Sequence, residues 1–245
     1  MKILGVIPSR YASSRFPGKP LAMIGDKSMV QTVYTQVSKS KLLDGVYVAT
    51  DHLDIESHVK QFNGHVMMTS ENHRNGTERI FELISRISEK YDAVVNIQGD
   101  EPFIQAEQID LLCEAIAKPD VDIATLAKRI TNEEELFNND VVKVVFNDHQ
   151  KAVYFSRYAI PFLRSVEKEK WMNSFDFYKH IGMYAYKTKV LKDLVSLAPS
   201  RLEQAESLEQ LRWLEAGYNI YIKETNMETF GIDRPEDIEK ALKRL

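Results

Sequence analysis

The stretch that decides the fold is Ile3-Leu-Gly-Val-Ile7, followed directly by Pro8-Ser-Arg-Tyr-Ala-Ser-Ser-Arg-Phe-Pro-Gly-Lys-Pro20. A short apolar run that stops at a proline predicts a buried strand that leads into a loop. Similar apolar runs follow at residues 46–49, 66–68 and 93–97. The chain therefore begins with several buried strands, each of which ends in a polar loop.

Helical spacing of apolar residues fills the intervals between these strands. The predicted helices cover residues 28–40, 54–62, 77–88 and about 109–116. Strands that alternate with helices of this length predict βαβ units and a mainly parallel sheet flanked by helices, which is an α/β fold.

The pattern becomes less regular after Val121. Further strands are predicted at 141–146, 152–155, 183–187 and 219–222, with one helix that ends at Gly217 and another that opens at Pro235. The intervening residues 165–178 are polar and aromatic and show no clear period. Since no linker separates the two halves, we expect one domain over residues 1–245, with an irregular excursion around residues 130–190.

The composition excludes several classes of protein. Of the 245 residues, 44% are hydrophobic and 28% are charged, which excludes disorder as a description of the whole chain. The single cysteine, Cys113, cannot form an intrachain disulfide, which fits a cytoplasmic protein. No apolar run approaches a membrane span or a signal-peptide core. A net charge of −4 argues against a nucleic-acid partner.

The loop at residues 8–20 carries a local excess of positive charge. It holds Arg10, Arg15, Lys19 and four hydroxyl side chains, and no acid precedes Asp26. The loop lacks both the G-x-G-x-x-G dinucleotide fingerprint and a Walker A motif. Cations, hydroxyls and backbone N–H groups together suit a polyphosphate. A solvated basic loop is the alternative, but ligands of parallel sheets bind at the carboxyl ends of strands, which favours an anion site.

Two carboxylates are candidates for a metal site. Asp100 follows the apolar strand at 93–97, where it would face the basic loop and is placed to hold Mg²⁺ on bound phosphates. A turn or cap role explains Asp100 equally well. Asp233 stands two residues before Pro235, a spacing that favours a helix cap. The spacing alone therefore leaves the metal site open.

Other chemistries lack their motifs. The six histidines form no H-E-x-x-H pattern and there is no cysteine pair, which argues against a zinc site. The absence of G-x-S-x-G leaves a hydrolase triad unsupported. His180 precedes the strand at 183–187, and its position fits either a pocket residue or a structural histidine.

Nine motifs along the chain occur in the order typical of one family. They are Ile7-Pro-Ser-Arg-Tyr-Ala-Ser-Ser-Arg-Phe-Pro-Gly-Lys-Pro20, Val48-Ala-Thr-Asp51, Met68-Thr-Ser70, Gly76-Thr-Glu-Arg79, Val95-Asn-Ile-Gln-Gly-Asp-Glu-Pro102, Tyr154-Phe-Ser-Arg-Tyr-Ala-Ile-Pro161, His180-Ile-Gly-Met-Tyr184, Leu208-Glu-Gln-Leu-Arg212 and Gly231-Ile-Asp233. With these motifs the sequence resembles the 3-deoxy-manno-octulosonate (KDO) cytidylyltransferases, the CMP-KDO synthetases of lipopolysaccharide biosynthesis.

The resemblance implies a fold, a reaction and a set of site residues. The fold would be nucleotide-diphospho-sugar transferase-like, a GT-A-like Rossmannoid, in a homodimer to which the excursion at 130–190 contributes dimer and sugar contacts. The enzyme would move CMP from CTP to the anomeric hydroxyl of KDO and release pyrophosphate. Catalysis would involve Arg10, Lys19 and Asp100. The implied ligand contacts are Ser9, Arg10, Ser13, Lys19, Thr69, Ser70, Gly76 and Thr77 for the nucleotide, Asp100 and Asp233 for Mg²⁺, and Gln98, Arg157, His180, Tyr184, Glu209 and Gln210 for the sugar acid.

The chain departs from the family pattern near the expected sugar pocket. The departures are Ser9 for alanine, Asn75 for serine, Arg201 for proline, and Gln204-Ala205 in place of a histidine or arginine pairing. They leave open an 8-amino-KDO acceptor or, as a weaker alternative, another sugar acid such as sialic acid. A glycosyltransferase of similar fold would consume a nucleotide sugar instead of a nucleotide. A non-catalytic nucleotide-binding module is disfavoured because Asp100 and Asp233 are both present.

Overall fold

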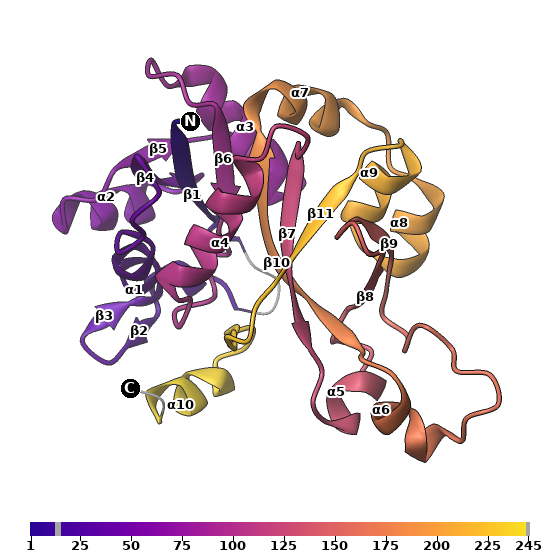
Figure 1. The fold of residues 1–245 in the computed structure, drawn as a ribbon. Coiled ribbons are helices and arrows are strands. Elements are labelled where there is room, and N and C mark those ends of the chain that lie inside the picture. Colours follow the sequence, from indigo (N-terminus) through magenta and orange to yellow (C-terminus); the bar gives the residue numbers. More distant parts are fainter. Residues whose placement is uncertain (13–15, 244–245) are drawn as a thin grey trace.

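The computed structural model describes residues 1–12 and 16–243 and is built on one large mixed sheet (Figure 1). Within the described residues the sheet has nine strands, seven of which lie in the order β11-β7-β10-β6-β1-β4-β5. These seven are β1 (Ile3–Ser9), β4 (Gly45–Thr50), β5 (Val66–Met68), β6 (Ala93–Asn96), β7 (Ile123–Arg129), β10 (Tyr178–Lys187) and β11 (Ile220–Glu224).

The sheet is parallel except where β10 and the hairpin beside it join. β1 pairs in parallel with β4 and β6, β4 with β5, and β7 with β11. β10 lies antiparallel between β6 and β7 and joins the two parallel parts. The prediction of a mainly parallel sheet flanked by helices is confirmed.

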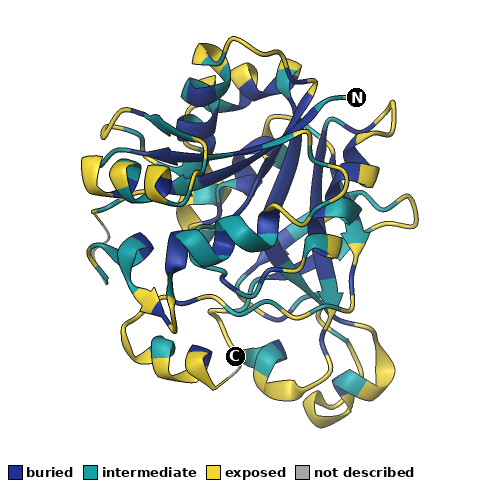
Figure 2. Cartoon of the chain, turned by 90° about the vertical axis from the view of Figure 1, so that its left-hand side faces the viewer, coloured by how far each residue is buried: buried dark blue, intermediate teal, exposed yellow. Residues whose placement is uncertain are grey.

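Helices cover both faces of the sheet, and most of its strand residues are buried between them (Figure 2). Alternate residues of β1 explain why: Ile3 and Ile7 pack into one apolar cluster and Leu4 and Val6 into the other. The first cluster takes side chains from α1 (Met29–Val37), α2 (Leu53–Gln61) and α4 (Ala106–Ile116). The second takes them from α3 (Gly76–Arg86), α7 (Thr188–Ser196) and α9 (Gln210–Glu215).

Helix starts follow from polar caps in the sequence. The Ser28 hydroxyl accepts from the Gln31 amide at 3.2 Å, and the Asn75 side chain accepts from the Glu78 amide at 2.9 Å. α3 therefore begins at Gly76, one residue before its predicted start. The remaining short elements are η1 (Lys19–Leu21), β2 (Met23–Ile24), β3 (Lys27–Ser28), α5 (Glu133–Phe137), η2 (Lys168–Lys170), α6 (Trp171–Ser174), α8 (Arg201–Glu206) and α10 (Glu236–Leu242).

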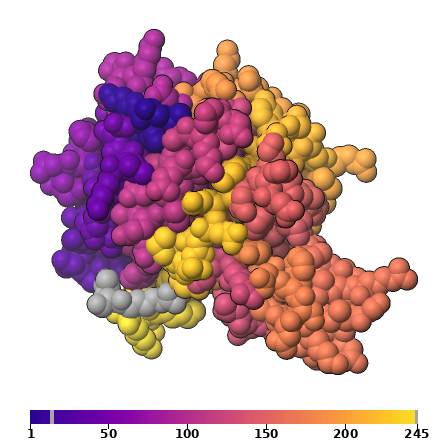
Figure 3. Space-filling view, viewed as in Figure 1, coloured from indigo at the N-terminus to yellow at the C-terminus, as the bar shows by residue number. Residues whose placement is uncertain are grey.

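The excursion contains the two strands predicted at 141–146 and 152–155, together with the short helices α5 and α6, which the sequence pattern does not predict. β8 (Lys143–Phe146) and β9 (Ala152–Ser156) form an antiparallel hairpin, and β8 also pairs with the start of β10. A small cluster around Trp171 packs below them. Tyr158 and Phe162 remain 69% and 74% exposed on this region, which projects from the body of the molecule (Figure 3).

The carboxyl ends of β1 and β6 lie close together. An added Cβ at Gly99 would lie 2.8 Å from the carbonyl oxygen of Pro8, so only glycine fits this contact without a shift of the backbone. The loop after β6 is thereby held against the loop after β1. Among the described residues, none of the helices combines the length and the apolar character needed to cross a membrane.

Candidate active site

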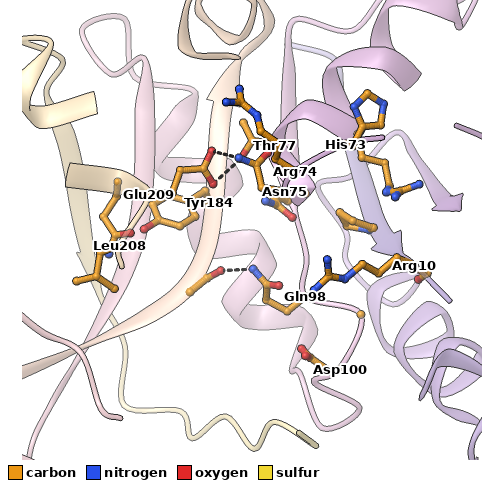
Figure 4. Close-up of a pocket in the computed structure, with 18 of the residues that line it drawn as sticks. Arg10, His73, Arg74, Asn75, Thr77, Gln98, Asp100, Tyr184, Leu208 and Glu209 are labelled. Atoms are coloured by element: carbon orange, nitrogen blue, oxygen red, sulfur yellow. Dashed lines mark hydrogen bonds between the residues drawn. The ribbon is translucent and has the colours of Figure 1, made fainter. Parts of the chain in front are cut away.

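A cavity of about 560 Å³ opens at the carboxyl ends of β1 and β6, next to β10 and α9. Arg10 lies on one side of it, Tyr184 and Glu209 lie on the other, and Gln98 lies between them (Figure 4). Twelve of the predicted site residues line this cavity: Ser9, Arg10, Lys19, Gly76, Thr77, Gln98, Asp100, His180, Tyr184, Glu209, Gln210 and Asp233.

The two candidate metal carboxylates converge on one cation. Lys19 Nζ donates to Asp100 Oδ2 at 2.7 Å and to the Ile232 carbonyl at 2.9 Å, and it lies 3.7 Å from Asp233 Oδ1. The Lys19 side chain is only 13% exposed. Asp100 and Asp233 are 133 positions apart in sequence, and the fold brings both to the ammonium group of the first loop. α10 begins at Glu236, and Pro235, not Asp233, occupies its N-cap position.

The first loop is held by a hydrogen bond between its own residues and by contacts with the end of β4. The Gly18 amide donates to the Tyr11 carbonyl at 2.9 Å, and Gly18 has a φ of +70°, which glycine adopts readily. The Tyr11 amide in turn donates to Asp51 Oδ1 at 3.1 Å. The Tyr11 ring stacks on His52 with a centroid separation of 3.9 Å. These contacts fix both ends of the stretch that carries Arg10 and Lys19.

A buried arginine supports this anchor. Arg79 is 3% exposed, and its two terminal nitrogens donate to Asp51 Oδ2 at 2.7 Å and to Thr69 Oγ1 at 2.6 Å. Arg79 also lines the cavity. The sequence motif that ends at Arg79 predicts no role for the arginine, because a salt bridge to the end of another strand has no local sequence signal.

Glu209 lies at the opposite end of the cavity, in an environment that favours the protonated form of its carboxyl group. Its carboxylate accepts from Asn75 Nδ2 at 2.8 Å and from Thr77 Oγ1 at 3.2 Å. Burial raises the pKa of Glu209 to about 7. The hydroxyl of Tyr184 is buried nearby and has no hydrogen-bond partner among residues 1–12 and 16–243. A polar ligand in the cavity would supply that partner.

Three predicted residues lie outside the cavity lining and one outside the described residues. The Thr69 hydroxyl is engaged by Arg79, so it contributes to the wall only through that arginine. Ser70 is exposed, and its amide donates to Glu82 Oε2 at 2.8 Å. Arg157 Nε donates to the Glu206 carbonyl at 2.8 Å, away from the cavity. Ser13 lies outside the described residues.

Several lining residues had no role in the sequence analysis. Several of them lie just before α3, in a loop that follows a predicted strand, and this position is the signal in the sequence that points to them. Asn96, Tyr186 and Trp213 come from apolar segments, where nothing in the local pattern distinguishes a cavity wall from the core. The additional lining residues include His73, Arg74, Asn75, Arg79, Asn96, Tyr186, Leu208 and Trp213.

Comparisons with known proteins agree with this geometry. The model of the cytidylyltransferase family matches residues 4–229. The 3-deoxy-manno-octulosonate cytidylyltransferase of Parabacteroides distasonis is 53% identical over 99% of this chain and 97% of its own length. The enzyme of the same name from Cytophaga hutchinsonii is 50% identical over 97% of this chain and 95% of its own length.

Solved structures give the same result. The structure of CMP:2-keto-3-deoxy-manno-octonic acid synthetase complexed with CTP matches with a TM-score of 0.92 and 40% identity, over 100% of this chain and 98% of that one. A 4-diphosphocytidyl-2C-methyl-D-erythritol synthase from Anaerococcus prevotii shares the fold, with a TM-score of 0.64 at 15% identity, over 99% of this chain and 96% of that one. The chain therefore belongs to the cytidylyltransferase family and, within it, to the 3-deoxy-manno-octulosonate cytidylyltransferases.

Proposed function

We propose that the protein transfers CMP from CTP to the anomeric hydroxyl of KDO, producing CMP-KDO and pyrophosphate for lipopolysaccharide biosynthesis. The observation that carries the proposal is one cavity lined by cations and carboxylates at one end and by hydrogen-bonding side chains at the other. A nucleotide triphosphate and a polyhydroxylated acid fit those two ends. The named relatives and the CTP-bound structure supply the identity of both substrates.

The nucleotide would bind at the first loop and the start of α3. Arg10 and Lys19 would contact the phosphates and stabilise the leaving pyrophosphate by fixed positive charge. Ser9 is buried at the end of β1, where its backbone approaches the same space. Gly76 and Thr77 would border the cytidine. Ser13, Thr69 and Ser70 are the further nucleotide contacts that the family resemblance implies.

The residues at the loop end fit a magnesium ion. Asp100 and Asp233 already converge on the Lys19 ammonium, so they present oxygen atoms to a shared cation. Mg²⁺ prefers one or two carboxylates together with substrate phosphates, which is the donor set available here. When bound, the ion would neutralise charge on the α-phosphate and lower the pKa of the attacking hydroxyl. Lys19 would then exchange its carboxylate partners for phosphate oxygens.

The sugar acid would bind at the opposite end. Gln98, His180, Tyr184, Glu209 and Gln210 all line this part of the cavity. The family resemblance also implies Arg157. These side chains would orient the anomeric hydroxyl toward the α-phosphorus, and positioning of this kind supplies much of the rate acceleration in such transfers.

The names of the relatives favour KDO over its 8-amino variant as the acceptor. Of the departures from the family pattern, Ser9 and Asn75 line the cavity. Arg201, Gln204 and Ala205 do not line it, so these three changes supply no observation for an altered sugar. KDO is therefore the acceptor that the proposal names.

We also propose a cytoplasmic homodimer. The projecting excursion exposes Tyr158, Phe162 and Phe175, three aromatic side chains that a second copy would cover. The one cysteine, Cys113, is buried and free, and a chain without disulfides suits a reducing compartment. Sedimentation of the purified protein would test the dimer.

An acceptor panel tests the reaction. The protein is incubated with CTP and Mg²⁺ and with KDO, 8-amino-KDO, N-acetylneuraminate or no acceptor, and pyrophosphate release is measured. We expect release that depends on the acceptor and is fastest with KDO. Preference for another acid would replace KDO as the substrate. CTP binding without release for any acceptor would contradict the catalytic proposal.

A further inference from the structure

His180 differs from the other side chains that line the sugar end because its ring contacts a buried side chain that lies behind the cavity wall. It lies on β10 and lines the cavity, and its Nε2 is 3.0 Å from Thr125 Oγ1 on the neighbouring strand β7. Thr125 is completely buried and does not line the cavity. The side chain of Thr125 can therefore affect a bound sugar only through His180 and the backbone of β10.

The hydrogen bonds of Thr125 define which atom donates. Its Oγ1 lies 2.6 Å from the Met183 carbonyl and 3.2 Å from the Ile181 carbonyl. Carbonyl oxygens only accept, so the single hydroxyl proton of Thr125 is directed to the backbone of β10. The Thr125 oxygen can then only accept from His180, which requires a proton on Nε2. Burial lowers the pKa of His180 to about 3, so the ring is neutral and Nδ1 carries no proton.

We propose that Thr125 is a positioning residue that locks His180 in the Nε2–H form and makes Nδ1 an acceptor for a hydroxyl group of the sugar acid. The assignment of the ligand rests on the proposed function. The assignment of the tautomer rests on the contacts of Thr125 alone.

The neighbouring side chain of Gln98 also leaves an acceptor atom for a ligand. β10 changes register between Ile181 and Tyr184, and the carbonyl of Gly182 in this bulge accepts from Gln98 Nε2 at 2.7 Å. One N–H of the Gln98 amide is thus engaged, which orients the amide and leaves Oε1 and the second N–H for a ligand. Thr125 holds the carbonyls on both sides of Gly182, so it supports this contact as well.

The consequence is that His180 Nδ1 and Gln98 Oε1 are acceptors at the sugar end, beside the Tyr184 hydroxyl, which can donate or accept. Glu209 adds a carboxylate whose oxygens already accept from Asn75 and Thr77. The hydroxyl groups of a polyol can donate to these acceptors.

The first experiment measures the tautomer directly and needs no substrate. Protein labelled with ¹⁵N-histidine is examined by long-range ¹H–¹⁵N correlation, in which the coupling pattern separates the Nε2–H from the Nδ1–H form. The His180→Asn variant identifies the His180 signals by their loss. We expect the Nε2–H form in the wild type and a mixture of forms in Thr125→Val. A wild-type Nδ1–H or doubly protonated ring would overturn the proposal even if the enzyme is fully active with KDO.

The second experiment measures substrate dependence with three variants. Thr125→Val removes the hydroxyl at nearly constant volume, Thr125→Ser retains it, and Thr188→Val is the matched control because Thr188 Oγ1 donates to the Tyr91 carbonyl at 2.9 Å away from the cavity. We expect Thr125→Val to raise the KM for KDO roughly ten-fold, as for loss of one well-placed hydrogen bond, with the KM for CTP unchanged.

The Thr125→Ser and Thr188→Val variants distinguish a positioning role of Thr125 from a general effect on protein stability. Thr125→Ser should return the KM for KDO to within about two-fold of the wild type, and Thr188→Val should alter neither KM. A Thr125→Val enzyme with equal changes for both substrates, or with none, would overturn the proposal. If Thr125→Val fails to fold, the wild-type and Thr125→Ser tautomers still decide it, because both must show Nε2–H.

Discussion

Lys19→Met tests the loop end of the cavity because it removes one charge and keeps the apolar stem. In the structure the Lys19 ammonium donates to Asp100 at 2.7 Å and to the Ile232 carbonyl at 2.9 Å, and it lies 3.7 Å from Asp233. The substitution leaves the two carboxylates without this cation. It also removes a positive charge that the proposed reaction directs at the leaving pyrophosphate.

Two opposite effects follow from that geometry. Loss of one preorganised charge costs about 3–4 kcal/mol of transition-state stabilisation, so kcat/KM for CTP should fall 10²- to 10³-fold. In the absence of nucleotide, Mg²⁺ no longer competes with an internal ammonium whose charged hydrogen bond contributes about 1.5–3 kcal/mol. The Asp100 and Asp233 side chains are 33% and 54% exposed, which selects the lower end of that range, so Mg²⁺ should bind roughly ten-fold more tightly.

The assay pairs kinetics with direct titration. Pyrophosphate release is followed as a function of CTP at saturating KDO, and Mg²⁺ is titrated calorimetrically into nucleotide-free protein. Lys60→Met is the matched control, since Lys60 is a 61% exposed lysine that pairs with Glu56 at 2.8 Å on α2. An unchanged CTP dependence would refute the phosphate role of Lys19, and unchanged or weaker Mg²⁺ binding would refute the shared-cation interpretation of Asp100 and Asp233.

Three further predictions concern single positions around the cavity. Asp100→Ala should lower Mg²⁺-dependent turnover more than 10²-fold while thermal unfolding shifts by only a few degrees, because the side chain is one-third exposed. Gly99→Ala should raise the KM for CTP roughly ten-fold or more, because its Cβ would lie 2.8 Å from the Pro8 carbonyl and displace the first loop. Glu209→Gln should remove a pH dependence of stability, because the pKa of Glu209 is raised from 4.5 to about 7 in the folded protein. Relative to the variant, the wild type is most stable below pH 4.5 and loses about 3 kcal/mol of unfolding free energy as the pH rises through 7. Urea unfolding at pH 5 and 8 measures the difference.

Each of these predictions has a result that contradicts it. Near-normal turnover of Asp100→Ala would remove the metal role. Gly231→Ala, whose added Cβ meets nothing within 4 Å, is the steric control for Gly99→Ala, and equal KM values in the two variants would contradict the close-approach argument. Equal stability differences between wild type and Glu209→Gln at both pH values would mean that the carboxyl titrates normally in the folded protein.

The parallel part of the fold was predictable because buried parallel strands are continuous apolar runs. Ile3–Ser9 and Ala93–Asn96 have this pattern, and helical spacing separates them from their neighbours. The insertion of β10 between β6 and β7 was not predictable, because an apolar run does not encode the direction of its strand. The predicted strand at 183–187 covers only the second half of β10, because Tyr178-Lys-His180 lacks the apolar signal.

The site was predictable where a strand-end loop carries an unusual charge. Lys19 and Asp100 were found in this way, and both line the cavity. The role of Thr125 could not be predicted, because a threonine inside a strand matches the β pattern whatever its hydroxyl contacts. Asp233 lies shortly before a helix, as an ordinary cap does, and the amides of Asp233 and Arg234 donate to Asp237 Oδ2 at 3.2 and 3.1 Å. Only the tertiary fold, or a family resemblance, relates Asp233 to the first loop.

The most direct test of the central claim is the identity of the product. The protein is mixed with CTP, KDO and Mg²⁺, and the reaction is followed by ³¹P NMR together with mass spectrometry of the nucleotide fraction. The account predicts that CTP is replaced by equal amounts of pyrophosphate and a single phosphodiester with the mass of CMP-KDO. Unchanged CTP, or CMP and pyrophosphate without a sugar-linked phosphodiester, would contradict it.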